Sequence, residues 1–351
     1  MVIYFKGRRC NKKGKRAKGG IPLVHSIHWL SFADPMQVHR NIEDLPVFRN
    51  AVATIGTFDG VHLGHRSIIA QLKAIAEKVD GETVIITFHP HPRRIVSGQQ
   101  QPILLLNSLP EKIRLLEAAG IDHLVVVPFT AAFAAQSPTA YIEDFLIRYF
   151  HPHTVIIGYD HRFGKDRGGD FHLLEKYAAN NAFQLVEIPG KVLDEATISS
   201  TRIRQSLLKG DVKMAAELLG YPYFFDGVVV KGNQLGRTLG YPTANLQLTD
   251  NEKLIPANGV YAVTAMINRS SFGILRGMMN IGVRPTVDGL NRVIEVNLFD
   301  FSSDIYGETV EVHLQERLRA EQKFDGLEAL KMQLAKDKEA SLHHFENHLP
   351  H

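Results

Sequence analysis

Two histidines three positions apart stand at the end of the ten-residue stretch G-T-F-D-G-V-H-L-G-H, residues 56–65. The apolar run 51–55 predicts a buried strand before this stretch, and the apolar spacing over 63–79 predicts a helix after it. The start of a helix offers unpaired N–H groups to an anion, and His62 and His65, at positions i and i+3, can face the same ligand there. This first motif therefore predicts a site for a nucleotide phosphate.

Glycines give the first motif the backbone freedom that a phosphate site needs. Gly56 and Gly60 permit tight turns and the close approach of a ligand, and Phe58 and Asp59 lie between them. We assign all four residues to the ATP-binding region. The alternative is an accidental H-x-G-H pattern, because the chain contains 17 histidines. The strand before the motif and the helix after it favour the phosphate site.

A second stretch, I-S-S-T-R-I-R at residues 198–204, combines hydroxyl and guanidinium side chains. Its three consecutive hydroxyl residues precede the apolar pattern of Ile203, Leu207 and Leu208, which predicts the N-terminus of a helix. Arginines at such a terminus can hold a phosphate with two hydrogen bonds. The alternative is an ordinary helix cap with solvated arginines. The phosphate-binding candidates of this second motif are Ser199, Ser200, Thr201, Arg202 and Arg204.

The third motif, L-G-Y-P-T-A-N at residues 239–245, carries Thr243 and Asn245 two positions apart. In an extended segment both side chains project from the same side. A hydroxyl and an amide oxygen are hard ligands that suit Mg²⁺ already bound to the phosphates of ATP. The alternative is a proline-containing turn capped by asparagine. We assign both residues to ATP and metal binding.

The elements that must position the first two motifs follow an α/β order. Between residues 50 and 190, apolar strand-like runs alternate with helical patterns. This order is typical of a parallel sheet covered by helices on both faces. The predicted strands are 51–55, 83–88, 124–127, 154–157 and 184–188.

From residue 225 onward the sequence changes to short β-rich runs separated by turn residues. This pattern predicts a small antiparallel barrel closed by a helix that begins near Phe324. A helix that Asp211 can start and Gly220 can end comes before the change and predicts a domain boundary near 220–223. The predicted strands of the barrel are 227–230, 259–267, 275–281, 293–299 and 309–314.

Charge is distributed unevenly along the chain. The net charge of +3 comes from residues 1–35, which hold eight Lys or Arg and one acid, whereas the remaining chain holds 32 basic and 36 acidic residues. We expect this basic segment to be a dispensable disordered arm, or the result of an upstream start codon assigned in error, with the folded protein beginning at Met36. The single Cys10 excludes an internal disulfide framework and no apolar run is long enough to span a membrane, so the cytoplasm is the expected compartment.

A basic arm and a small barrel also occur in nucleic-acid-binding proteins. Residues 221–320, however, contain nine Lys or Arg against ten Asp or Glu, so the barrel lacks the positive field that binding to a phosphate backbone requires. We therefore expect neither a nucleic-acid partner nor a membrane partner. The sequence makes no prediction of oligomeric state.

The first two motifs resemble those of the H-x-G-H and I-S-S-T-x-x-R nucleotidyltransferases, which bind the phosphates of ATP on a Rossmann-like sheet. Two further strings, T-F-H-P-H-P at 87–92 and G-Y-D-H-R-F-G at 158–164, resemble one branch, the bacterial bifunctional riboflavin kinases and FAD synthetases. The third motif resembles the riboflavin kinase signature of that family. Four strings that follow it resemble kinase segments in the expected order: 259–263, 280–286, 295–301 followed by 304–307, and 318–324.

The resemblance implies two reactions. In the barrel, ATP with Mg²⁺ would phosphorylate riboflavin to FMN, with Glu295 as general base. In the N-terminal module, FMN would attack a second ATP to give FAD and pyrophosphate, with His62, His65 and Arg204 stabilising the phosphates. FMN and FAD would be substrate and product rather than resident cofactors. The alternative is a single-function nucleotidyltransferase with a non-catalytic barrel, which the presence of Thr243, Asn245 and Glu295 disfavours.

The resemblance also implies further site residues and domain limits. Asp160 would help to hold the nucleotide or a metal. The implied flavin-binding residues are His91, Pro92, Arg284, Arg319 and Glu321. The expected parts are a basic extension at 1–35, an FMN adenylyltransferase domain at 36–220 and a riboflavin kinase domain at 221–345. The sequence departs from the usual family pattern at His161, Met279 and Asn297, near ligand segments but outside the residues assigned to chemistry.

Overall fold

The computed structural model describes residues 35–96, 104–188, 198–232, 235–269, 272–286 and 289–348. The predicted basic extension, 1–35, lies outside these residues except for Pro35.

The N-terminal half is built on a six-stranded sheet in the order β1-β4-β3-β2-β5-β6, with every neighbouring pair parallel. Central strands of such a sheet are covered on both faces, which explains their continuous Val and Ile runs. The strands are β1 (Gln37–His39), β2 (Val52–Ile55), β3 (Thr83–His89), β4 (His123–Pro128), β5 (Thr154–Gly158) and β6 (Gln184–Ile188).

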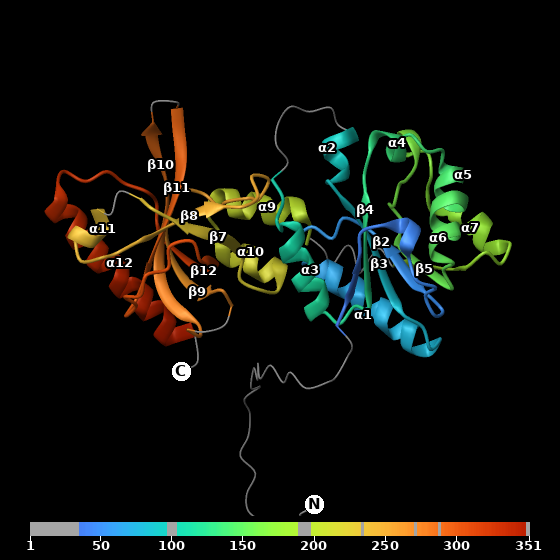
Figure 1. Ribbon diagram of the computed structural model, residues 1–351, viewed down its shortest axis with the longest axis horizontal. Helices are drawn as coiled ribbons and strands as arrows, with labels where there is room; N and C mark the ends of the chain where they lie inside the picture. Colours follow the sequence, from blue (N-terminus) through green and yellow to red (C-terminus); the bar gives the residue numbers. More distant parts are fainter. Residues whose placement is uncertain are drawn as a thin grey trace, which may run out of the picture. The chain divides into compact units, whose positions relative to one another are not determined.

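Two hydrophobic clusters cover the two faces of this sheet. Ile69 and Leu72 of helix α1 and Leu116 of helix α3 pack against one face, whereas Phe145 and Leu174 pack against the other. Figure 1 shows the same division of helices. The helical elements of this half are η1 (Ile42–Asp44), α1 (Leu63–Lys78), α2 (Pro92–Val96), α3 (Leu109–Ala118), α4 (Ala131–Ala134), α5 (Pro138–Ala140), the π-helix η2 (Tyr141–Ile147), α6 (Arg148–Phe150), η3 (Lys165–Arg167) and α7 (Phe171–Ala179).

Two helices, α9 (Ser200–Lys209) and α10 (Val212–Leu219), come between the sheet and the barrel in the sequence. Asp211 caps the start of α10 by accepting the N–H of Met214, and Gly220 ends the helix in the left-handed conformation, as the sequence predicted. Leu207 and Leu219 of these helices belong to the same hydrophobic cluster as the interior of the barrel.

The C-terminal half is a closed barrel with the strand order β10-β11-β8-β7-β12-β9 and antiparallel pairs. Ile294, Val296 and Leu298 of β11 belong to its core, so the alternating Glu295 and Asn297 face the opposite side of the strand. The elements are β7 (Phe224–Val230), α11 (Leu235–Thr238), β8 (Ala244–Leu248), β9 (Gly259–Ile267), β10 (Leu275–Thr286), β11 (Gly289–Leu298), β12 (Thr309–Arg319) and α12 (Leu327–His348). Figure 1 shows α12 beside the barrel.

The predicted fold class, a parallel α/β sheet followed by an antiparallel barrel and a terminal helix, is confirmed. Every predicted strand is present, but β1 and β8 were not predicted, and β10 and β12 run further than expected. The terminal helix begins at Leu327 rather than near Phe324, after Gly326 with its positive φ of 142°.

Candidate active sites

The first motif forms the turn between β2 and α1, as the sequence predicted. His62 is the N-cap of α1, and its Nδ1 atom accepts a hydrogen bond from the backbone N–H of His65 at 3.3 Å. The two imidazole rings stack, with centroids 3.7 Å apart and planes inclined by 15°. A Cβ on Gly64 would lie 3.2 Å from the same Nδ1 atom, so the glycine leaves room for the His62 ring.

Burial keeps both imidazoles neutral. Burial lowers the pKa of His62 to about 4, even though the carboxylate of Asp59 raises it. Burial, followed by the charges of His62 and Lys112, holds the pKa of His65 well below its usual value. The Nδ1 atom of His65 is buried and has no hydrogen-bond partner among the described residues. An unpaired buried polar atom costs free energy that a bound ligand would recover.

The second motif lies against the first. Ser200 donates a hydrogen bond from its hydroxyl to the carbonyl oxygen of Asp59 at 2.9 Å, although the two residues are 141 positions apart. Arg204 forms an ion pair with Asp59 and donates from Nε to the carbonyl oxygen of Leu104 at 2.7 Å. Ser199 caps α9 by accepting the N–H of Arg202 at 3.3 Å, and Thr201 is exposed. The two predicted phosphate motifs therefore meet at Asp59.

Asp59 is bonded to protein groups in this structure. Its side chain is 2% exposed, and its Oδ1 atom accepts the N–H groups of Leu106 at 2.9 Å and Asn107 at 3.2 Å. Because Arg204 binds the other carboxylate oxygen, Asp59 holds both the second motif and the chain at residues 104–107. A carboxylate used in this way fixes the backbone around the two motifs.

The remaining residues of the first motif pack tightly. Gly60 has a positive φ of 92°, and a Cβ there would lie 2.7 Å from a methyl group of Leu106, so the position requires glycine. The ring of Phe58 is buried, lies against Gly56 and has its centroid 4.9 Å from that of His65.

The other candidates of the N-terminal half differ in their surroundings. His91 precedes α2, which begins at Pro92, and burial lowers its pKa to about 4; the charges of Asp59 and Lys112 also act on it. Asp160 is exposed in the turn after β5. The structure thus relates His91 electrostatically to the first motif and gives Asp160 no such contact.

Sequence reasoning missed Lys112, a buried residue of α3 that is 7% exposed. Burial lowers its pKa, Asp59 raises it, and its charge acts on both His65 and His91. No carboxylate of the described residues lies within ion-pair distance of its ammonium group. Lys112 comes four residues before the buried Leu116, on the same face of the helix, and this spacing was the sequence feature that could have indicated its burial.

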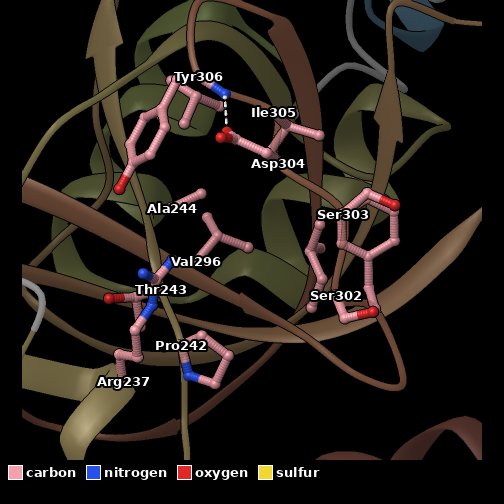
Figure 2. Close-up of a pocket in the computed structure, with 13 residues that line it drawn as sticks. Arg237, Pro242, Thr243, Ala244, Val296, Ser302, Ser303, Asp304, Ile305 and Tyr306 are labelled. Carbon is pink, nitrogen blue, oxygen red and sulfur yellow. Dashed lines mark hydrogen bonds between the residues drawn. The ribbon is translucent and has the colours of Figure 1, made fainter.

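Cavities on the barrel are lined by predicted site residues. The first has a volume of about 420 Å³ and is lined by Arg237, Pro242, Thr243, Ala244 and the loop 301–306. Figure 2 shows Arg237, Pro242 and Thr243 gathered together, with Ser303 and Asp304 lying across from them. The second has a volume of about 280 Å³ and contains five predicted site residues: Thr243, Arg284, Glu295, Arg319 and Glu321.

Thr243 lines both cavities, and among the residues that the structure describes it alone is shared by their linings. In the second cavity, Arg284 donates to Oε1 of Glu295 at 2.8 Å. Asn297, a departure from the family pattern, donates to the carbonyl oxygen of Pro242 at 2.7 Å and so ties β11 to the third motif. Polar residues that sequence reasoning did not assign also line this cavity, among them Asn280 and Asn297.

The expectation that Thr243 and Asn245 project from the same side stays a prediction. Thr243 lies immediately before β8, which begins at Ala244. Asn245 lines a third cavity of about 410 Å³ and packs so closely on Gly232 that a Cβ there would lie 2.1 Å from its Nδ2 atom. Its Cα atom pairs with that of Glu295 on the neighbouring strand β11.

Like Arg284, the other two predicted flavin-binding residues of the second cavity already have protein partners. Arg319 binds both carboxylate oxygens of Asp337 on α12, with Nε to Oδ1 at 2.9 Å and Nη2 to Oδ2 at 2.7 Å. Glu321 accepts a hydrogen bond from Nδ2 of Asn258 at 3.2 Å. These contacts fix the rim of the cavity on the side of α12.

Comparison with known proteins matches both halves of the chain to known families. A family model described as FAD synthetase matches residues 45–202, and one described as riboflavin kinase matches residues 219–345. A bifunctional riboflavin kinase/FMN adenylyltransferase from Haemophilus influenzae is 38% identical over 307 residues, which cover 87% of this chain and 98% of the relative. The chain belongs to this family of bifunctional enzymes. Its relative from Bacillus subtilis is 37% identical over 85% of this chain and 93% of its own.

Among solved structures, the family member resembles a crystal structure from Streptococcus pneumoniae that is described as a macrolide-efflux protein. The two are 34% identical, with a TM-score of 0.77 over 87% of this chain and 98% of the other. None of the described helices is long and apolar enough to cross a membrane.

Proposed function

We propose that this chain catalyses two successive reactions. It phosphorylates riboflavin with ATP to give FMN and ADP, and it then transfers the adenylyl group of a second ATP to FMN to give FAD and pyrophosphate. Riboflavin, FMN and ATP are the substrates. The observation that carries this proposal is the presence of both motif sets on one chain, each in its own family match.

We assign the adenylyltransferase to residues 36–220 and the kinase to residues 221–345. The two family matches, 45–202 and 219–345, support this division. The first strand of the barrel, β7, begins at Phe224, just after the assigned boundary.

In the kinase half, the cavity that contains Glu295 receives riboflavin, and the cavity beside the loop 301–306 receives ATP. A general base must reach the hydroxyl that it deprotonates, so the position of Glu295 in this cavity supports its assignment to the acceptor. The ribityl 5′-oxygen attacks the γ-phosphorus, the bond to the β-phosphate oxygen breaks, and the hydroxyl proton passes to Glu295. Thr243 lies where donor and acceptor meet, because it lines both cavities.

The residues present fit Mg²⁺ that arrives with ATP. Among the described residues, no group of three or more His, Cys, Asp or Glu side chains is arranged to hold a metal. The hydroxyl of Thr243 and the amide oxygen of Asn245 are hard donors of the kind that complete a Mg²⁺ shell made largely of phosphates and water. When bound, the ion would neutralise charge on the transferring phosphates.

In the adenylyltransferase half, the phosphate oxygen of FMN attacks the α-phosphorus of ATP and pyrophosphate leaves. This displacement needs no protein nucleophile. His62 and His65 donate hydrogen bonds to the phosphates as neutral imidazoles, and the second motif contributes helix N–H groups at the start of α9. Arg204 holds the side chain of Asp59 in position through their ion pair and adds positive charge to the site.

One assay tests the proposed function. The purified protein is incubated with riboflavin, ATP and Mg²⁺, and riboflavin, FMN and FAD are separated by chromatography over time. We expect FMN first and FAD afterwards. A single-function nucleotidyltransferase with a non-catalytic barrel would form FAD from supplied FMN but leave riboflavin unchanged.

A further inference from the structure

A short bridging segment, Leu104–Ser108, forms hydrogen bonds with residues of the first two motifs. Oδ1 of Asp59 accepts the N–H groups of Leu106 at 2.9 Å and Asn107 at 3.2 Å. Arg204 donates from Nε to the carbonyl oxygen of the first residue of the segment at 2.7 Å. The geometry of both motif residues therefore depends on where this segment lies.

The bridging segment also forms hydrogen bonds with residues of the kinase half. Leu105 donates its N–H to the carbonyl oxygen of Glu252 at 2.7 Å, and Leu254 donates its N–H to the carbonyl oxygen of Leu105 at 2.8 Å. These two bonds make a parallel bridge between Leu105 and Lys253. Residues 252–254 fall within the riboflavin kinase family match, 219–345.

Lys253 completes the attachment with a buried charge. Its Nζ atom donates to the carbonyl oxygen of Leu106 at 2.7 Å and pairs with Oε2 of Glu111 at 2.5 Å. Both side chains are 2% exposed. The same Oε2 atom accepts the N–H of Ser108 at 2.9 Å, so one ammonium group fixes the segment at two points.

The aromatic ring of Tyr223, from the kinase half, packs against the ammonium group of Lys253. The Nζ atom lies 4.5 Å from the ring centroid of Tyr223, and the Tyr223 hydroxyl donates to the carbonyl oxygen of Leu254 at 2.6 Å. A buried ion pair is a weak source of stability, because desolvation offsets much of its Coulomb energy. Its value here lies in the position that it imposes on the bridging segment.

We propose that Lys253, a residue of the kinase half, positions the adenylyltransferase site. This inference rests on the proposed function of the two motifs. Without the ammonium group, the carboxylate of Glu111 and the carbonyl of Leu106 would be buried without a partner, so the bridging segment would shift. Asp59 and Arg204 would shift with it, and a displacement of about 1 Å at a phosphate-transfer site can reduce the rate by roughly 100-fold.

The test compares Lys253→Met with Lys336→Met in the full chain, because Lys336 is an exposed lysine of α12. Both half-reactions are measured, the adenylyl transfer with FMN supplied and the phosphorylation with riboflavin. We expect Lys253→Met to lower kcat for adenylyl transfer by roughly 10- to 100-fold, more than it changes KM for FMN. The kinase rate should change by less than about threefold, and Lys336→Met should match the wild type in both steps.

Two further variants keep the test decisive. If Lys253→Met folds poorly, Lys253→Met combined with Glu111→Met removes both buried charges and should give the same kinetic split, because nothing then holds the Leu106 carbonyl. Lys253→Met combined with Asp59→Asn should lose little more adenylyl transfer than the worse single variant, because both act through one segment.

Three results would each overturn the proposed role of Lys253. They are equal losses of rate in the two reactions, an unchanged rate of adenylyl transfer, and additive losses of that rate when Lys253→Met is combined with Asp59→Asn. A wild-type protein that makes no FAD from FMN would refute the proposed function instead.

Discussion

The imidazole of His62 caps the helix that carries His65, and the two rings stack 3.7 Å apart. Because Nδ1 of His62 accepts the backbone N–H of His65, the proton of neutral His62 sits on Nε2. This tautomer presents an N–H donor on the side of the ring away from the helix. The cap thus fixes both the orientation of the ring and the donor that a phosphate would meet.

Buried histidines predict a loss of stability in acid. Burial lowers the pKa of His62, His91 and His161 to about 4, from 6.5. Between pH 6.5 and 4 the unfolded chain therefore binds protons that the folded chain does not, and the unfolding free energy falls as the pH falls through this window. For His62 alone the loss is on the order of 3 kcal/mol by pH 4.

Chemical denaturation at pH 7.5 and 4.5 measures this effect. His62→Gln should show a smaller difference between the two pH values than the wild type. His172→Gln is the control, because His172 is exposed and its pKa is raised by Glu175. If His62→Gln and the wild type lost equal stability in acid, the imidazole of His62 would not be a buried neutral group.

His65→Ala should separate the two reactions. Its Nδ1 atom is buried without a described partner in the first motif, and removal of one such donor typically lowers a rate by about 10²- to 10³-fold. We expect FMN to accumulate from riboflavin while FAD formation falls by that factor, as followed by chromatography. An equal loss of riboflavin phosphorylation in a folded protein would contradict the two-site assignment.

Local signals were sufficient for most of the fold. The strand, glycine turn and helix of the first motif, and the caps Asp211 and Gly220 of α10, are set by neighbouring residues and were predicted. The strand β8 was not predicted because it is only five residues long and begins directly after a proline-containing turn.

Partners distant in sequence could not be predicted in the same way. Asp59 and Leu106 are 47 residues apart, and Lys253 and Glu111 are 142 apart. The first pair joins two segments within the N-terminal half and the second joins the two halves, and no local pattern records either kind of packing. The resemblance identified Arg204 as a phosphate ligand, whereas its present partner, Asp59, follows only from the packed structure.

Glu295→Gln should stop riboflavin phosphorylation and spare adenylyl transfer. The substitution keeps the shape of the side chain and a hydrogen bond to Arg284 but removes the proton acceptor. General-base catalysis contributes about 10²- to 10⁴-fold, so the kinase kcat should fall by that range. Conversion of supplied FMN to FAD is the internal control. A kinase rate within a few-fold of the wild type would exclude Glu295 as the base.

Thr243→Ala tests the meeting point of the two kinase cavities. Because Thr243 lines both, we expect the loss of its hydroxyl to disturb the alignment of donor and acceptor and the Mg²⁺ that accompanies ATP. The kinase kcat should fall by roughly 10²-fold or more, and more Mg²⁺ should be needed for half-maximal rate. Thr249→Ala is the matched control, since Thr249 is exposed just beyond the end of β8. The measurement is the rate of riboflavin phosphorylation as a function of Mg²⁺ concentration. If the Thr243→Ala profile coincided with that of Thr249→Ala, the Thr243 side chain would have no part in phosphoryl transfer.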